Sequence, residues 1–165
     1  MSVILIGMPS SGKSTLGVLI AKRLGYSFID SDLLIQEREG KLLHKIIAGE
    51  GDESFLAIES DVNCAITARD AVIATGGSVV YSEMAMTHLK TLGKIVYLQI
   101  PYEEMCRRLG DYSHRGVIIR EGATLADMYA ERMPLYEKYA DVTVDVENAD
   151  LAHSVERICE ALGNE

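Results

Sequence analysis

The segment from Gly7 to Ser14 restricts the fold of this chain more than any other part of its sequence. It reads Gly-Met-Pro-Ser-Ser-Gly-Lys-Ser and fits the pattern Gly-x-x-x-x-Gly-Lys-[Ser/Thr]. The apolar run Val3–Ile6 comes directly before it, as expected of a buried parallel strand. After it, leucine and isoleucine recur at helical spacing from Leu16 to Leu24. A strand, a glycine-rich turn and a helix in this order predict a loop that binds phosphate at the helix N-terminus.

The residue types inside this loop match the chemistry of phosphate binding. Glycines let backbone N–H groups curl around phosphate oxygens, and the helix N-terminus adds a positive dipole and unpaired donors. We expect Lys13 to reach the β- and γ-phosphates of ATP and the Ser14 hydroxyl to bind Mg²⁺. A chance match in a glycine-rich turn is the alternative. The residues expected to bind ATP or ADP here are Gly7, Ser10, Ser11, Gly12, Lys13, Ser14 and Thr15.

The remainder of the chain alternates short apolar runs with helical patterns. Such alternation predicts an α/β fold with a parallel sheet covered by helices on both faces. The length of 165 residues fits a single domain over residues 1–165. Segment 110–122 shows no periodicity, and long loops in compact domains usually act as lids or binding loops. Further strands are expected at 26–29, 71–74, 94–99 and 141–144, and helices at 33–39, 42–48, 53–68, 84–92, 101–109, 124–139 and 151–162.

The acidic composition argues against some partners. The chain has 16 Lys and Arg residues against 25 Asp and Glu, a net charge of −9, which disfavours broad nucleic-acid binding. The apolar run near its start is far shorter than the roughly 20 residues that a membrane span needs. The 3 cysteines show no metal-binding spacing and suit a reducing compartment. We therefore expect a cytoplasmic monomer that binds a small-molecule substrate and neither nucleic acid nor a membrane.

Two aspartates follow the second expected strand. If the extended backbone continues, Asp30 and Asp32 point the same way, because side chains two residues apart share a face. One carboxylate would then support Mg²⁺ while the other orients an acceptor hydroxyl and takes its proton. The alternative is a helix N-cap with a solvated neighbour, a role that suits Ser31 and Asp32. Beside a phosphate loop, we favour the functional interpretation.

Two charges and two glycines suggest a second part of the site. Glu59 falls on the apolar face of the helix at 53–68, and Arg132 on that of the helix at 124–139. Buried charges are costly unless they are paired or bind a ligand, so these two either pair within the core or line a polar pocket. Gly76 and Gly77, after the third strand, form either a tight turn or a close approach to a ligand.

Two arginines near the expected lid are further candidates. Arg108 lies at the end of the helix at 101–109, where an arginine commonly complements the helix dipole. Arg115 lies in the loop at 110–122. A loop arginine in a phosphoryl-transfer enzyme can close over the transferred phosphate, so we expect Arg115 to act in catalysis.

Taken together, these pieces resemble the shikimate kinase family, in the nucleoside-monophosphate-kinase-like branch of P-loop proteins. The matching segments lie at 7–17, 28–32, 53–59, 74–77, 107–111, 115 and 131–141. The resemblance implies a three-layer P-loop NTPase fold, with a five-stranded parallel sheet of order 2-3-1-4-5 and a lid at about 110–122. It also implies an ATP-dependent kinase that transfers the γ-phosphate to a hydroxyl of a small polar metabolite, namely shikimate.

The resemblance assigns roles to single residues. Asp30 would support the metal and Asp32 would bind the acceptor hydroxyl. The backbone of Gly76 and Gly77 would line the acceptor site, and Arg132 would grip the carboxylate of the substrate; Glu59, from the helix pattern, is a further candidate to bind the substrate. Arg115 would act on the phosphates from the lid, and Arg108 would lie against adenine.

The chain departs from the family pattern at the acceptor end. It has Phe55-Leu56 where the family usually has Phe-Arg, and Ser78 where the family has a third glycine. In the lid it has Arg115-Gly116-Val117-Ile118 in place of Arg-Pro-Leu-Leu. Two alternatives therefore stay open: a related kinase with a gluconate-like or nucleotide-like acceptor, and a nucleotide-binding regulatory protein without transfer activity. A GTPase switch would need a guanine-reading Asn-Lys-x-Asp element, which the sequence lacks.

Overall fold

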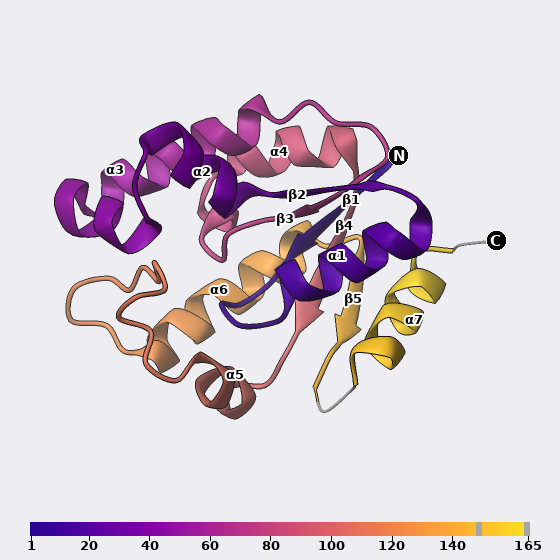
Figure 1. The fold of residues 1–165 in the computed structure, drawn as a ribbon. Helices are drawn as coiled ribbons and strands as arrows, with labels where there is room; N and C mark the ends of the chain where they lie inside the picture. Colours follow the sequence, from indigo (N-terminus) through magenta and orange to yellow (C-terminus); the bar gives the residue numbers. More distant parts are fainter. Residues whose placement is uncertain (148–149, 164–165) are drawn as a thin grey trace.

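The structure, a computed structural model that describes residues 1–147 and 150–163, has helices on both faces of a parallel sheet (Figure 1). The strand order β2-β3-β1-β4-β5 confirms the three-layer, five-stranded fold with the order 2-3-1-4-5. The strands are β1 (Ser2–Ile6), β2 (Ser27–Asp30), β3 (Ala71–Ala74), β4 (Gly93–Gln99) and β5 (Val142–Asp145). The helices are α1 (Lys13–Leu24), α2 (Ser31–Glu39), α3 (Leu43–Ala65), the 3₁₀ helix η1 (Val79–Tyr81), α4 (Glu83–Leu92), α5 (Tyr102–Leu109), α6 (Leu125–Tyr139) and α7 (Leu151–Ala161).

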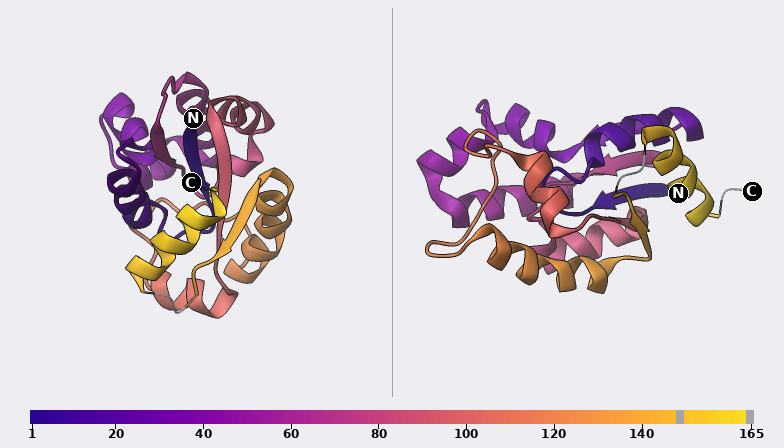
Figure 2. Two further views of the ribbon diagram at one scale, coloured as in Figure 1. Left: turned by 90° about the vertical axis from the view of Figure 1, so that its right-hand side faces the viewer. Right: turned by 90° about the horizontal axis from the view of Figure 1, so that it is seen from below.

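The central strands are apolar because helices cover both of their faces. Every residue of β1 and β3 is buried. Helices α1 and α7 pack together on one face of the sheet, and α4 and α6 lie on the other (Figure 2). Since the paired strands are parallel, their carboxyl ends lie at one edge of the sheet. The segments that follow β1, β2 and β3 therefore meet at that edge, where ligands of such folds bind.

Two helices with a break between them make up α3. The sequence predicts separate helices at 42–48 and 53–68, and the structure interrupts α3 at Gly51, whose backbone is not helical. Gly51 has a φ of 83° and a ψ of 168°, so the break between the two expected helices is a single residue. The helix also ends at Ala65, because Ile66 has extended backbone. The 3₁₀ helix η1 is absent from the predictions, since three residues are too few to show a periodicity.

The loop at 110–122 packs against α2 and α3. Its Ile118 is buried with Ile35, Ile46 and Phe55 in a cluster separate from the main core. Gly116 has a φ of +59°, and a Cβ there would lie 2.6 Å from the Cβ of Leu43 at the start of α3. The loop can approach α3 this closely only because residue 116 is a glycine. This contact places the loop across the carboxyl edge of the sheet, where a lid is expected.

Candidate active site

The loop between β1 and α1 has the backbone that its glycines predict. Gly7 has a φ of +151°, and a Cβ there would lie 2.7 Å from the carbonyl oxygen of Leu98 on β4. The N–H of Ser11 donates to the carbonyl of Met8 at 3.2 Å and closes the turn. Gly12, in left-handed conformation, leads directly into α1. The unpaired backbone N–H groups at this helix N-terminus are available to phosphate oxygens.

Lys13 folds back over this loop. Its Nζ donates to the carbonyl oxygens of Gly7 and Met8, both at 2.8 Å, and to the hydroxyl of Ser11 at 3.4 Å. Burial lowers the pKa of Lys13 to about 8, although the carboxylate of Asp32 acts in the opposite direction. The side chain that should meet the phosphates is thus held at the mouth of the loop by two carbonyl oxygens and a hydroxyl.

Ser14 and Asp30 meet at the expected metal position. The Ser14 hydroxyl donates to Asp30 Oδ2 at 2.6 Å. The other oxygen of Asp30 accepts from the N–H of Asp32 at 3.0 Å and so caps α2. The extended backbone therefore does not continue to Asp32, which lies in the first turn of α2. The assumption that the two carboxylates share a strand face is wrong. Asp30 is the last residue of β2 and also the N-cap of α2, so no extended residue follows it.

Asp32 nevertheless faces the same cavity as Lys13. Burial raises its pKa to about 6, and the neighbouring Asp30 carboxylate raises it further while Lys13 lowers it. The first turn of α2, and not an extended strand as expected, thus places the Asp32 carboxylate in the cavity. A carboxylate with a pKa near neutral is suited to accept a proton from a hydroxyl.

Glu59 on α3 is the most deeply buried carboxylate of the site. Its side chain is 2% exposed, and Ser78 donates a hydrogen bond to its Oε2 at 2.6 Å. Its Oε1 has no hydrogen-bond partner. Burial raises the pKa of Glu59 to about 7, against the opposing effect of the Ser78 hydrogen bond. A buried oxygen without a partner is costly to the folded protein and is open to a ligand that donates a hydrogen bond.

Arg132 on α6 is equally buried. Its Nε donates to the hydroxyl of Tyr81 at 3.3 Å, and one terminal nitrogen donates to the carbonyl of Ile118 in the lid at 2.7 Å. The guanidinium also lies over the ring of Tyr81, 5.3 Å from its centroid. The other terminal nitrogen, Nη1, faces Gly77, since a Cβ there would lie 3.1 Å from it. Arg132 therefore couples the lid to the turn after β3.

Glycine is required at the first position of that turn. A Cβ at Gly76 would lie 2.9 Å from Asp32 Oδ1 and closer still to Glu59 Oε1. Two carboxylates therefore approach the backbone only because position 76 has no side chain. The turn itself is fixed by Tyr136, whose hydroxyl donates to the carbonyl of Gly77 at 2.6 Å.

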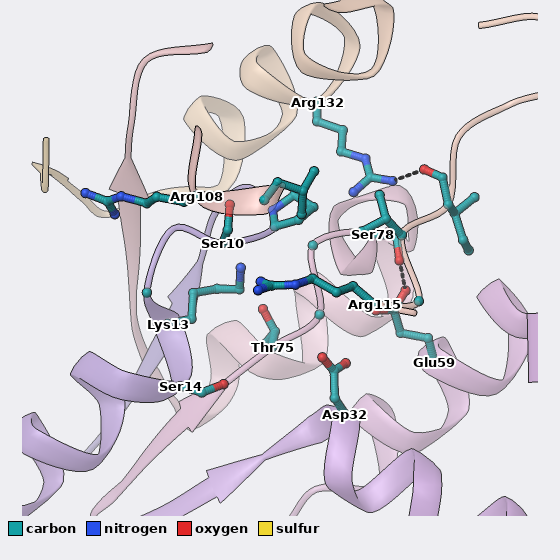
Figure 3. Close-up of a pocket in the computed structure, with 18 of the residues that line it drawn as sticks. Ser10, Lys13, Ser14, Asp32, Glu59, Thr75, Ser78, Arg108, Arg115 and Arg132 are labelled. Carbon is teal, nitrogen blue, oxygen red and sulfur yellow. Dashed lines mark hydrogen bonds between the residues drawn. The ribbon is translucent and has the colours of Figure 1, made fainter. Parts of the chain in front are cut away.

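One cavity of about 540 Å³ brings these residues together (Figure 3). Its lining comes from the phosphate loop, α1, α2, α3, the turn after β3, α5, the lid and α6. Gly7, Ser11 and Asp30 do not line it but accept hydrogen bonds from Lys13 and Ser14, which do. The predicted residues that line it are Ser10, Gly12, Lys13, Ser14, Thr15, Asp32, Glu59, Gly76, Gly77, Arg108, Arg115 and Arg132.

The two arginines near the lid take different positions. Arg115 points into the cavity from the lid (Figure 3). Arg108 lies at the rim, where its Nε donates to Glu104 at 2.6 Å and a terminal nitrogen donates to the carbonyl of Val146 at 3.1 Å. The hydroxyl of Ser10 donates to the carbonyl of Met105 on α5 at 3.3 Å, which ties the phosphate loop to the helix that carries Arg108.

Thr75, Ser78 and Phe55 are among the lining residues that the sequence interpretation did not include in the site. Thr75, whose hydroxyl donates to the carbonyl of Leu5 at 2.9 Å, follows β3 directly, and its place at a strand end was a usable signal. Ser78 was noted only as a departure from the family pattern. No sequence signal distinguishes Phe55 from an ordinary residue of the core, because it lies on the apolar face of its helix.

The fold and the cavity define a class of protein. A phosphate loop at the carboxyl edge of a parallel 2-3-1-4-5 sheet, beside a charged cavity beneath a loop, is the arrangement of a P-loop phosphotransferase related to the nucleoside monophosphate kinases. The family model described as shikimate kinase matches residues 9–163 of this chain. The chain belongs to the shikimate kinase family.

Similar proteins agree with this assignment. A shikimate kinase from Moorella thermoacetica is 37% identical over 163 residues, covering 98% of this chain and 94% of that protein. The structure of a shikimate kinase from Acinetobacter baumannii in complex with shikimate has a TM-score of 0.86 at 27% identity, covering 96% of this chain and 90% of that one. A shikimate kinase from Aquifex aeolicus has a TM-score of 0.81 at 30% identity, covering 99% and 96%. The chain is accordingly an ATP-dependent phosphotransferase.

Proposed function

We propose that this protein transfers the γ-phosphate of ATP to a hydroxyl of shikimate, giving shikimate 3-phosphate and ADP. The observation that carries the proposal is that Asp32 and Arg132 line the same cavity as Lys13. The same cavity thus presents three groups. The Asp32 carboxylate can bind a hydroxyl, the Arg132 guanidinium can bind a carboxylate, and the Lys13 ammonium can bind phosphate. The relatives compared above are shikimate kinases, so a gluconate-like or nucleotide-like acceptor is not favoured.

In the proposed reaction, Asp32 orients the acceptor hydroxyl and takes its proton as that oxygen bonds to the γ-phosphorus. The bond from this phosphorus to the oxygen of ADP breaks on the opposite side. Lys13 and Arg115 stabilise the negative charge on the transferred group, and the N–H groups of the phosphate loop hold the phosphates in place. Arg132 holds the acceptor by its carboxylate, while Gly76 and Gly77 allow it to lie close to the backbone. Arg108 at the rim lies against the adenine.

The pair Ser14 and Asp30 fits a magnesium site. Both supply hard oxygen ligands, and they already lie 2.6 Å apart. Mg²⁺ commonly takes one or two protein oxygens and completes its shell with water and phosphate oxygens. Within residues 1–147 and 150–163, no group of three or more His, Cys, Asp or Glu side chains could hold a metal ion. When bound, Mg²⁺ neutralises charge on the β- and γ-phosphate oxygens.

We further propose that the chain acts as a single domain over residues 1–165, as a monomer in the cytoplasm, without nucleic acid or membrane. Within the described part of the chain, no helix has the length and apolar character needed to cross a membrane. The net charge of −9 supports the expectation that nucleic acid is not a partner.

The release of ADP tests the proposed function directly. The rate should rise and saturate as shikimate is added to protein, ATP and Mg²⁺, and the product should carry one added phosphate by mass. The small hydrolysis of ATP without shikimate is subtracted. If neither shikimate nor any of a panel of hydroxylated metabolites raised the rate, the chain would instead be a nucleotide-binding regulator without transfer activity.

A further inference from the structure

The turn from Ser78 to Tyr81 places two hydroxyls beside the two buried charges of the acceptor end. Ser78 precedes η1, and Tyr81 is its last residue. A 3₁₀ helix has three residues per turn, so side chains three apart lie on the same side. The N–H of Tyr81 donates to the carbonyl of Ser78 at 3.0 Å, and the intervening Val79 and Val80 are buried in the core. The valines thus anchor the turn while its hydroxyls face the charges.

Each hydroxyl contacts one of the two buried charges, and the Tyr81 hydroxyl also hydrogen-bonds the carboxylate of Glu131. Ser78 donates to Glu59 Oε2 at 2.6 Å. Tyr81 accepts from Arg132 Nε at 3.3 Å, and its ring stacks against the guanidinium. The two partners come from distant parts of the chain, α3 and α6, and meet only at this turn. In Figure 3, Glu59 approaches the cavity from below and Arg132 from above, with Ser78 on the side of Glu59.

Glu59 and Arg132 do not pair with one another. Both are almost fully buried, at 2% and 1% exposed, and both line the cavity. Opposite charges in a weakly polar interior attract strongly, so a direct ion pair would be the simplest arrangement. Instead Glu59 accepts from a neutral serine and keeps Oε1 without a hydrogen-bond partner, although Arg132 is close enough to lower its pKa.

We propose that Ser78 and Tyr81 are positioning residues that hold Glu59 and Arg132 apart, so that both stay available to an acceptor carrying a carboxylate and hydroxyl groups. This inference rests on the proposed function and concerns how the same cavity selects its acceptor. Arg132, which also hydrogen-bonds Tyr136, turns Nη1 toward Gly77 at the cavity, where an anionic group can reach it, and Glu59 keeps Oε1 for a hydroxyl. An acceptor without a carboxylate would leave the guanidinium buried and without an anion, which disfavours neutral sugars.

The ionisation of Glu59 reports on this arrangement. The charged and titratable groups that face it are Asp32 from α2, Lys13 from α1, and Arg132 and Tyr136 from α6. The hydrogen bond from Ser78 favours the charged carboxylate and so opposes the effect of burial. Removing the Ser78 hydroxyl should therefore raise the pKa of Glu59, whereas removing a hydroxyl elsewhere should not.

The test compares two variants with two matched controls. Ser78→Ala and Tyr81→Phe each remove one hydroxyl of the turn. Ser60→Ala removes the hydroxyl of the residue that follows Glu59 in sequence. Ser60 Oγ lies 2.7 Å from Ser82 Oγ, and Ser60 does not line the cavity. Tyr129→Phe removes a phenolic hydroxyl on α6 that donates to the carbonyl of Ile100 at 2.8 Å. Ser78→Thr keeps the hydroxyl and serves as the conservative replacement.

Steady-state kinetics should separate the two ends of the cavity. We expect Ser78→Ala to raise the KM for shikimate by about tenfold, and Tyr81→Phe by about threefold to tenfold, as for the loss of one hydrogen bond to a charged group. The KM for ATP should stay unchanged in both variants, and Ser78→Thr should restore the KM for shikimate. Controls that raise this KM as much as the two variants would overturn the proposal.

A titration that needs no acceptor completes the test. The carboxyl carbon of Glu59, followed by ¹³C NMR in the free protein and identified by its loss in Glu59→Gln, should titrate about one pH unit higher in Ser78→Ala than in Ser60→Ala. An equal titration in both variants would overturn the role of Ser78. If the wild-type protein showed no saturation with shikimate, the proposed function would fail, and the titration would still decide whether Ser78 controls the charge of Glu59.

Discussion

The phosphate end of the cavity comes from one continuous segment, residues 7–15, whereas the acceptor end draws Asp32, Glu59 and Arg132 from three different helices. The first end offers backbone N–H groups and a lysine held by carbonyl oxygens. The second offers side-chain charges, of which Glu59 is held by the Ser78 hydroxyl and Arg132 by the carbonyl of Ile118. Backbone groups are fixed by the fold itself, but buried charges cost stability unless ligands or neighbours satisfy them. We therefore expect the first end to determine catalysis and the second to determine specificity and pH dependence.

The largest expected effect is at the phosphate end. Lys13→Ala should lower turnover by about a hundredfold to a thousandfold, as for the loss of one donor to a developing charge. The thermal midpoint should change little, because the Lys13 amine binds carbonyl oxygens of a loop that glycines already shape. Turnover and thermal melting of the same preparations give both results. Near-normal turnover in Lys13→Ala would refute the assignment of the phosphate loop.

A smaller effect, on stability, is expected at the acceptor end. The pKa of Glu59 is about 7 in the folded protein against an ordinary value of 4.5, so the folded state binds more protons between these two pH values. The free energy of unfolding contributed by this group is present below pH 4.5 and is lost as pH rises to about 7. The loss amounts to about 3 kcal/mol.

Glu59→Gln removes this titration while keeping the shape of the side chain. Denaturant unfolding at pH 5 and at pH 8 should show a smaller pH-dependent loss of stability in the variant than in the wild type. Ser60→Ala, at the next residue of α3, serves as the control. Parallel pH profiles in Glu59→Gln and the wild type would mean that burial of Glu59 does not control the charge of the acceptor end.

A gain of about tenfold is expected where the chain departs from the family. Leu56 contacts the cluster that contains Ile118 and lines a neighbouring cavity with Tyr81 and Arg132, not the main cavity. Leu56→Arg should lower the KM for shikimate by about tenfold, as for one added hydrogen bond from a charged group. The KM for ATP should not move. A higher KM for shikimate would show that a positive charge at position 56 does not bind the carboxylate of the acceptor.

The smallest effect concerns the lid, which joins the two ends. Segment 110–122 is held by Ile118 on the acceptor side and places Arg115 in the main cavity, which it shares with Lys13. Hydrogen exchange within this segment should slow when ADP and shikimate are both present, because Arg115 and Arg132 then have anions to bind. ADP alone and shikimate alone are the controls. Equal exchange in all four states would exclude a lid that responds to either end.

The sequence determined the strands and the phosphate loop, whereas the strand order was implied by the family resemblance. Residues 7–15 are adjacent in the chain, so their spacing alone specifies the glycines, the lysine and the helix that follows. The apolar runs also predicted the five strands, because both faces of a central parallel strand are buried. Glu59 and Arg132 were found for a related reason, since a charge on an apolar helix face is visible as a break in the pattern.

Only the tertiary structure decided how the acceptor end is held. Tyr81 and Arg132 are 51 residues apart, Gly77 and Tyr136 are 59 apart, and Glu59 and Ser78 are 19 apart. No local rule of periodicity or capping reaches across such separations. Asp32 entered the cavity from a helix turn although the strand pattern suggested an extended segment, because Asp30 caps α2 with its own side chain. Phosphate binding follows from local backbone geometry, whereas the arrangement of buried charges depends on which distant elements the packed core brings together.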